Sequence, residues 1–113
     1  MSALVVSSDV VELIAASDRP LLLEFGADWC PPCHAIEPIL AEIAEEHRDA
    51  IDVRTVDVDR VPDLVVRWSI VSAPTLLLFV EGEPVLRLVG ARPKAALLEA
   101  LAPFLRPTGV GLC

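Results

Sequence analysis

The chain has 113 residues and a formal net charge of -8, from 17 acidic and 9 basic residues. This length suits a single domain and excludes a multi-domain or repeat architecture. Apolar residues make up 54% of the chain, enough for one core. The acidic balance argues against binding to nucleic acid or to anionic membranes. Three cysteines are too few for a disulfide scaffold, and the spacing of two of them indicates redox or metal chemistry.

The N-terminus lacks the features of a secretion signal. The first basic residue is Arg19, whereas a signal peptide places positive charge before its apolar stretch. Uninterrupted apolar runs, such as residues 76–80, are far shorter than the roughly 18 residues that a membrane span needs. We therefore expect a cytoplasmic protein that is not bound to a membrane.

Hydrophobic periodicity predicts alternating strands and helices along the chain. Residues 3–6 form a short predicted edge strand, and Asp9 with Glu12 has the spacing of a capping box that opens the first helix. Residues 20–25 are a leucine-rich run of strand length, typical of a strand buried on both faces. Apolar residues then recur at helical spacing over residues 36–47, with glutamates on the opposite face, which predicts an amphipathic helix.

The second half of the chain continues this alternation. Residues 51–57 alternate as a strand does, residues 59–68 predict a third helix, and residues 75–89 predict a β-hairpin. A last helix is predicted at residues 93–105. Parallel strands joined by helices, followed by an antiparallel hairpin, predict an α/β fold with a mixed central sheet of about five strands flanked by four helices.

The segment Trp29-Cys30-Pro31-Pro32-Cys33-His34 lies between the buried strand and the second helix. A helix N-terminus carries partial positive charge and unpaired N–H groups, so a thiol there is stabilised as thiolate. Because the thiolate is the nucleophile in disulfide exchange, we expect Cys30 to attack and Cys33 to resolve the mixed disulfide. Pro31 and Pro32 fit the first helical turn and stiffen this active-site loop.

Two other interpretations of the cysteine pair are less favoured by the sequence. A zinc site would need two more thiolate or imidazole ligands, and the chain offers only His34, His47 and Cys113, with no second Cys-x-x-Cys motif. Two merely packed thiols are not expected at a strand-to-helix junction beside Trp and Pro-Pro. Redox chemistry without a metal is therefore favoured.

With these features the chain resembles the thioredoxin family, from about Ala3 to Leu105. The matching residues, in family order and at family spacing, are Phe25, Ala27, the Trp29-to-Cys33 motif, Pro38, Asp59, Ala73-Pro74-Thr75 and Gly90. The resemblance implies a thioredoxin domain at residues 1–105, with residues 106–113 as a flexible C-terminal tail. It also implies a monomeric protein-disulfide reductase that holds no cofactor, acts on disulfide-containing proteins and is recycled by an NADPH-dependent thioredoxin reductase.

By the same resemblance, Pro74 should be a cis-proline that faces the two cysteines; cis bonds are nearly confined to X-Pro. A groove built from Trp29, the Ala73-Pro74 backbone and Gly90-Ala91 would take up a strand-like segment of the target through main-chain bonds. Gly90 permits close approach, although a simple role at the end of a strand stays open.

Glu24 is an acid in an otherwise apolar strand, and an unpaired buried carboxyl has a raised pKa and can exchange a proton near neutrality. The family usually has Asp there, and the resemblance implies that Glu24 accepts a proton from Cys33. The alternative is a strand-edge Glu that reaches solvent. Three departures bear on this site: Thr55 stands where a Lys is common, Gly26 replaces an aromatic residue that forms one wall, and Pro31 replaces a Gly.

Four other residues have an ordinary interpretation, and two of them, His34 and Cys113, also have a functional one. His34 would add positive charge near the thiols, or is a solvated helix residue. His47 is interpreted as a helix-end residue and Trp68 as a packing residue. Cys113 is an accessible tail thiol that could be oxidised, and we favour an incidental role.

The leading hypothesis is a general protein-disulfide reductase. A second hypothesis is an exported oxidoreductase of the cytochrome-maturation type, many of which carry Cys-Pro-Pro-Cys; these usually have an N-terminal anchor and an inserted segment, and neither is found in the sequence. A third, from a different class, is a binding subunit whose dithiol is dispensable. A cysteine-free double mutant that kept all cellular function would favour this third hypothesis.

Overall fold

A five-stranded mixed sheet runs through the centre of the computed structural model, which describes residues 3–4 and 6–105. The elements in chain order are β1 (Ala3–Leu4), α1 (Ser7–Ala16), β2 (Leu21–Gly26), α2 (Pro31–Glu46), β3 (Asp52–Asp57), α3 (Pro62–Arg67), β4 (Thr75–Val80), β5 (Glu83–Val89) and α4 (Lys94–Leu101), with short 3-10 helices at Val58–Arg60 and Ala102–Phe104. The strand order is β1-β3-β2-β4-β5. β2 is parallel to β3 and antiparallel to β4, which confirms the predicted α/β fold.

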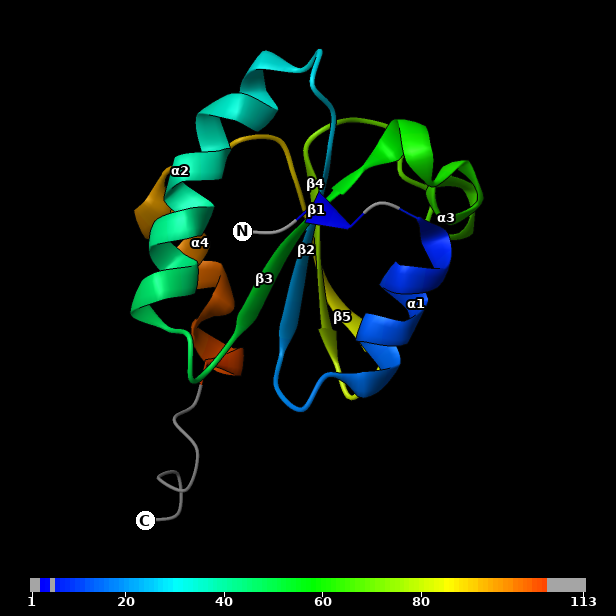
Figure 1. The fold of residues 1–113 in the computed structure, drawn as a ribbon. Coiled ribbons are helices and arrows are strands. Elements are labelled where there is room, and N and C mark those ends of the chain that lie inside the picture. The colour runs from blue at the N-terminus through cyan, green and yellow to red at the C-terminus, as the bar shows by residue number, and fades with distance from the viewer. Residues whose placement is uncertain (1–2, 5, 106–113) are drawn as a thin grey trace.

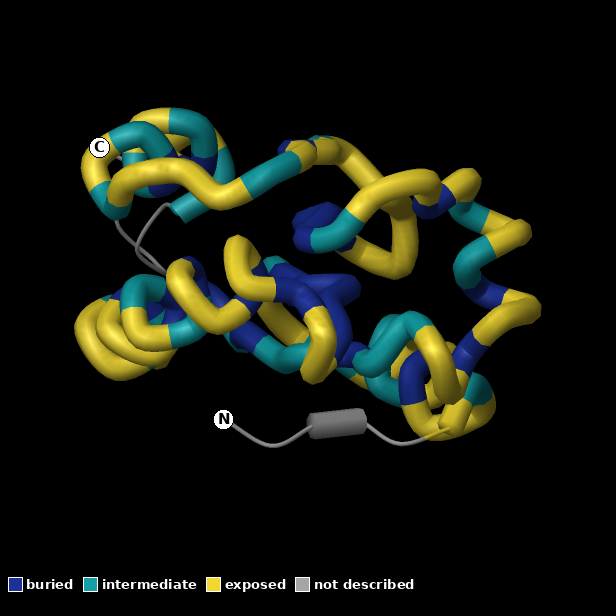
Figure 2. The backbone as a smooth tube through the Cα atoms, turned by 90° about the horizontal axis from the view of Figure 1, so that it is seen from above, coloured by how far each residue is buried: buried dark blue, intermediate teal, exposed yellow. Residues whose placement is uncertain are grey.

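Helices cover both faces of the sheet. Figure 1 shows α2 and α4 on one side of the strands and α1 and α3 on the other. Successive side chains of β2 point to opposite faces. Leu22 therefore packs with the core of α2 and α4, whereas Leu23 and Phe25 pack with that of α1 and α3. Figure 2 shows the buried strands in dark blue between the two layers. The prediction of a strand buried on both faces is confirmed.

The start of α1 differs from the sequence prediction. The helix begins at Ser7, its N-cap is Val6, and no side chain caps it. The carbonyl oxygen of Val6 accepts hydrogen bonds from the N–H groups of Asp9 and Val10, at 3.1 and 3.4 Å. Asp9 thus lies within the first helical turn and is not the N-cap residue. The prediction of a capping box formed by Asp9 and Glu12 is therefore wrong.

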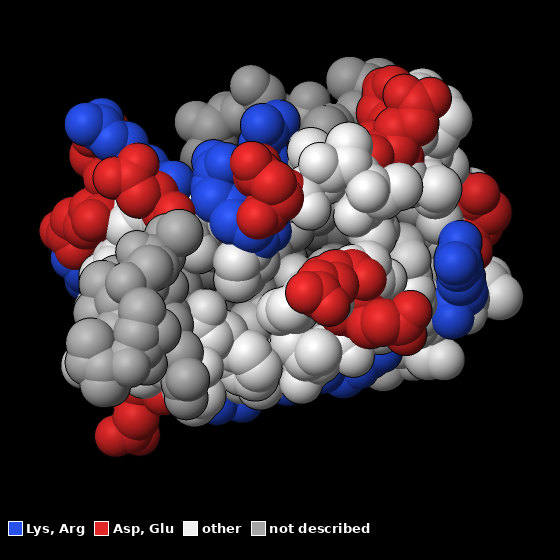
Figure 3. Space-filling view, turned by 90° about the horizontal axis from the view of Figure 1, so that it is seen from below, with Lys and Arg blue, Asp and Glu red and all other residues white. Residues whose placement is uncertain are grey.

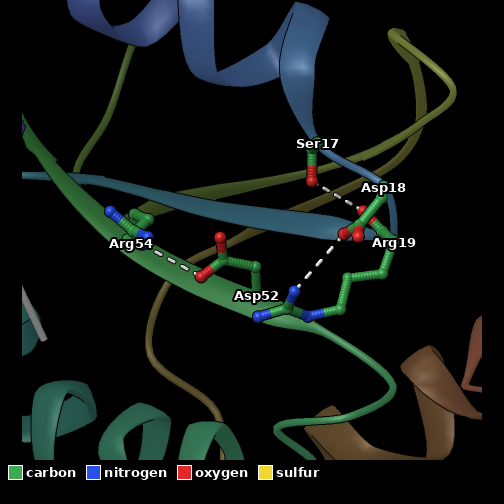
Figure 4. Close-up of polar contacts among 5 residues, drawn as sticks. All are labelled: Ser17, Asp18, Arg19, Asp52 and Arg54. Atoms are coloured by element: carbon green, nitrogen blue, oxygen red, sulfur yellow. Dashed lines mark hydrogen bonds and ion pairs between the residues drawn. The ribbon is translucent and has the colours of Figure 1, made fainter.

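Near the beginning of β2 and of β3, charged side chains form pairs with residues close to them in the sequence. Arg54 bonds to Asp52 at 2.9 Å and Arg19 to Asp18 at 3.4 Å, and the Ser17 hydroxyl donates to the Arg19 carbonyl at 2.8 Å (Figure 4). Other basic residues that lie in ion pairs are Arg48, Arg60 and Lys94. Figure 3 views the molecule from the end opposite to that of Figure 2 and shows basic side chains beside acidic ones. Each of the basic residues named in this paragraph therefore has an acidic partner.

Two further expectations concern the C-terminal tail and the absence of a membrane span. The predicted tail at residues 106–113, with Cys113, lies outside the described residues. Among the helices of residues 3–4 and 6–105, none combines the length and the apolar character that crossing a bilayer requires.

Candidate active site

Three chain segments meet at one end of the sheet because of the strand directions. Phe25, near the end of β2, pairs with Thr75 at the start of β4, and Thr75 pairs with Val89 at the end of β5. The cysteine motif that follows β2, Pro74 before β4 and Gly90 after β5 therefore lie at the same end, the top of Figure 1. The topology brings together the residues that the sequence analysis singled out for this site.

Cys30 and Cys33 form a disulfide, with their Cα atoms 5.3 Å apart. Cys30 is the N-cap residue of α2, and Pro31 and Pro32 are the first two residues of the helix. The backbone N–H of Cys33 donates to the Cys30 sulfur at 3.2 Å. Cys30 is 3% exposed and Cys33 is fully buried. This N–H group and the helix N-terminus both favour negative charge on the Cys30 sulfur once the disulfide is reduced.

The segment before β4 lies against the disulfide. The peptide bond between Ala73 and Pro74 is cis, as the resemblance implied. The carbonyl oxygen of Ala73 lies 3.5 Å from the Cys30 sulfur, and the N–H of Gly90 donates to the Pro74 carbonyl at 2.8 Å. Gly90 has a φ of 88°, in the left-handed region that favours glycine. Gly90 therefore lies at the end of a strand and also has a backbone conformation that favours glycine.

Trp29 is 66% exposed beside the disulfide. Its indole N–H donates to a carboxylate oxygen of Asp59 at 2.8 Å, which ties the motif to the 3-10 helix that follows β3. The sequence indicates only that Asp59 begins a helix, and this hydrogen bond could not be predicted from it, because nothing in a single sequence links two positions so far apart. Ala91 follows Gly90 and is exposed.

Glu24 is buried in the middle of the sheet. It pairs with Thr55 on one side and with Leu76 on the other, and it is 1% exposed. Its Oε2 atom has no hydrogen-bond partner. Burial, with a smaller contribution from the charge of Glu37, raises the pKa of Glu24 to about 7, against the opposing effect of His34. The alternative of a strand-edge Glu that reaches solvent is wrong.

The carboxyl of Glu24 lies next to Cys33. A Cβ atom placed at Gly26 would overlap with Oε2 of Glu24 and would lie 3.1 Å from the Cys33 sulfur. The carboxyl oxygen and the sulfur therefore border the same small volume above Gly26. From the sequence, Gly26 is interpreted only as the loss of an aromatic residue that forms one wall of the site.

His34 is tied to the loop before α2. Its Nε2–H donates to the carbonyl of Asp28 at 2.7 Å, and its Nδ1 lies 3.9 Å from a carboxylate oxygen of Glu37. The hydrogen bond to Asp28 is the main cause that raises the pKa of His34, and Glu37 adds to it. The i,i+3 spacing of His34 and Glu37 could have revealed this pair in the sequence. In the described ranges, no group of three or more His, Cys, Asp or Glu residues is arranged to hold a metal ion.

The family model "Thioredoxin" matches residues 3–103. The chain belongs to the thioredoxin family. It is 45% identical over 89 residues to the thioredoxin of Mycobacterium tuberculosis H37Rv, an alignment that covers 79% of this chain and 77% of that protein. It is also 45% identical to the bifunctional thioredoxin reductase/thioredoxin of Mycobacterium leprae, of whose length it spans only 19%. The solved Plasmodium falciparum thioredoxin matches with a TM-score of 0.84 at 25% identity, over 92% of this chain and 99% of that one.

As a thioredoxin-family protein with a Cys30–Cys33 disulfide, the chain is a thiol–disulfide oxidoreductase. Membership also implies, in general terms, substrates that contain disulfides and a reductase that returns the pair to the dithiol state.

Proposed function

We propose that the chain is a general protein-disulfide reductase in which Cys30 attacks the target and Cys33 resolves the mixed disulfide. One observation carries this assignment of roles. The Cys33 N–H points at the Cys30 sulfur at 3.2 Å, at the N-terminus of α2, whereas Cys33 itself is fully buried beside an acid. The sulfur that is stabilised as thiolate and lies nearer to solvent is the one suited to attack.

The reaction transfers two electrons from the dithiol to the target. Cys30 thiolate attacks one sulfur of the target disulfide, and the other target sulfur leaves as a thiolate and takes a proton from water. Cys33 then gives its proton to the Glu24 carboxylate and attacks the Cys30 sulfur. The bond between Cys30 and the target breaks, the second target sulfur leaves and is protonated, and the Cys30–Cys33 disulfide remains. A Glu24 pKa of about 7 allows the carboxyl to accept and release this proton near neutrality.

The target binds as an extended segment beside the disulfide. Ala73 offers backbone groups next to Cys30, and the hydrogen bond from the Gly90 N–H to the Pro74 carbonyl holds Gly90 and the following Ala91 near this segment. Trp29, which is largely exposed, provides an apolar surface. Recognition through main-chain groups and one aromatic ring gives affinity with little sequence preference, as a general reductase requires.

The proposal extends to partners and compartment. The Mycobacterium leprae relative is named for both a thioredoxin reductase and a thioredoxin, which supports a thioredoxin reductase as the source of electrons. We propose that this reductase is NADPH-dependent. A dithiol that must be kept reduced suits the cytoplasm, where protein thiols stay reduced. We propose a monomer of one thioredoxin domain, residues 1–105, that carries no cofactor of its own and binds neither nucleic acid nor membranes.

Insulin reduction coupled to NADPH and a bacterial thioredoxin reductase tests the proposal. The wild type should turn over, Cys30→Ser should be inactive, and Cys33→Ser should accumulate a mixed disulfide that mass spectrometry detects. The exposed Glu45→Gln variant serves as a matched control and should behave as the wild type. A wild type without turnover that is indistinguishable from Cys30→Ser would overturn the proposal. A strongly oxidising reduction potential against glutathione would also exclude a general reductase.

A further inference from the structure

The backbone conformation at Gly26 does not require a glycine. It is the last residue of β2, pairs with Asp57 of β3 and is buried. Within the described ranges, the glycines with positive φ are Gly82 and Gly90, so the conformation at Gly26 is one that any residue adopts. A glycine inside a sheet weakens the strand and marks a place where another group approaches closely.

The approaching group is the carboxyl of Glu24. Residues 24 and 26 lie on the same face of β2, the face that is covered by α2. The side chain of Glu24 leans along the strand, so that even a single added carbon at position 26 would overlap with its Oε2 atom. The same carbon would lie 3.1 Å from the Cys33 sulfur. The space that a side chain at position 26 would fill therefore holds the acid beside the resolving thiol.

We propose that Gly26 is a positioning residue, whose missing side chain provides the space in which the Glu24 carboxyl reaches Cys33. The two positions then act as one unit: the longer acid requires the glycine. This inference rests on the proposed function, because it assumes that Glu24 accepts the proton of Cys33 during resolution.

The inference predicts an effect on one of the two exchange steps. In Gly26→Ala, the Cβ atom forces the Glu24 carboxyl to turn away, and Cys33 loses its proton acceptor. Attack by Cys30 depends instead on the helix N-terminus and on the Cys33 N–H group. The atoms nearest to the added Cβ are the Glu24 carboxyl and the Cys33 sulfur, not that N–H group. Gly26→Ala should therefore slow resolution and leave the first attack unchanged.

Stopped-flow measurements with a fluorescent peptide disulfide separate the two steps. We expect Gly26→Ala to slow resolution at pH 7 by about tenfold or more, since a positioned general base typically contributes at least that much. The pH profile of resolution should lose its inflection near pH 7, which belongs to Glu24. Glu24→Asp shortens the acid by one methylene, so Glu24→Asp/Gly26→Ala should resolve faster than Gly26→Ala alone.

Glu24→Gln distinguishes failure of this inference from failure of the proposed function. If Glu24→Gln resolves at the wild-type rate, the proton-acceptor role of Glu24 fails. If Glu24→Gln is slow but Gly26→Ala is as fast as the wild type, the role of Glu24 stands and the positioning role of Gly26 is refuted. If Gly26→Ala does not fold, the inference requires that Glu24→Asp/Gly26→Ala does fold, as judged by circular dichroism. A double variant that also fails to fold would refute the positioning role of Gly26.

Discussion

Replacing Glu24 by Gln should remove a pH-dependent cost from the folded state. Glu24 is almost fully buried and its Oε2 atom has no partner, so its pKa rises from 4.5 to about 7. Between these two values the folded protein binds more protons than the unfolded chain, and the free energy of unfolding falls as the pH rises. The wild type keeps its full stability below pH 4.5 and loses this contribution until the pH exceeds about 7.

The size of the loss follows from the two pKa values. Each pKa unit corresponds to about 1.36 kcal/mol, so the change from 4.5 to about 7 corresponds to about 3 kcal/mol. Gln has nearly the shape of Glu and does not ionise. The difference in unfolding free energy between Glu24→Gln and the wild type should therefore shift by about 3 kcal/mol in favour of the variant between pH 4 and pH 8. Any pH-independent cost of burying the amide cancels in this comparison.

Urea denaturation of the oxidised proteins at pH 4 and pH 8 measures this shift. Glu45→Gln is the matched control, because Glu45 is exposed on α2 and should leave the pH dependence as it is in the wild type. A difference between wild type and Glu24→Gln that is the same at both pH values would refute the reasoning, since the carboxyl would then titrate alike in the folded and unfolded chains.

Two further predictions concern the surroundings of Glu24 and the core. His34→Gln removes a positive charge and should raise the pKa of Glu24, whereas Glu37→Gln removes a negative charge and should lower it. Carbon NMR titration of the Glu24 carboxyl measures both shifts. Shifts in the same direction would contradict the opposite effects assigned to His34 and Glu37. Leu40→Ala opens a cavity where α2 packs on the sheet and should lower the free energy of unfolding by about 2–5 kcal/mol in urea denaturation; a loss well below this range would mean that the core collapses around the site.

Regular patterns made most of the fold predictable. The strand β2 and its burial follow from an uninterrupted apolar run between helix-like segments, and the meeting of the cysteines with Pro74 follows from the strand order. Contacts between distant positions could not be predicted in this way. The hydrogen bond from Trp29 to Asp59 joins two loops that the sequence does not relate. The start of α1 was mistaken because the backbone carbonyl of Val6 forms the first turn, and a backbone group leaves no signature in the sequence.

Glu24 and Gly26 illustrate a different limit. Considered singly, each is unfavourable by the resemblance to the family: the acid is one methylene longer than expected, and the glycine removes a wall of the site. On a strand, however, residues two apart lie on the same face, and a side chain that leans along the strand uses the volume of its neighbour. Here the Glu24 carboxyl occupies the place beside Cys33 that a side chain at position 26 would take. The sequence contains the signal, an acid and a glycine two apart in a strand buried on both faces, but it has meaning only when the two positions are considered as a pair. A long acid on a buried strand is thus evidence about its neighbour: with Glu24 placed as it is, any side chain at position 26 would overlap with the carboxyl and force it to move.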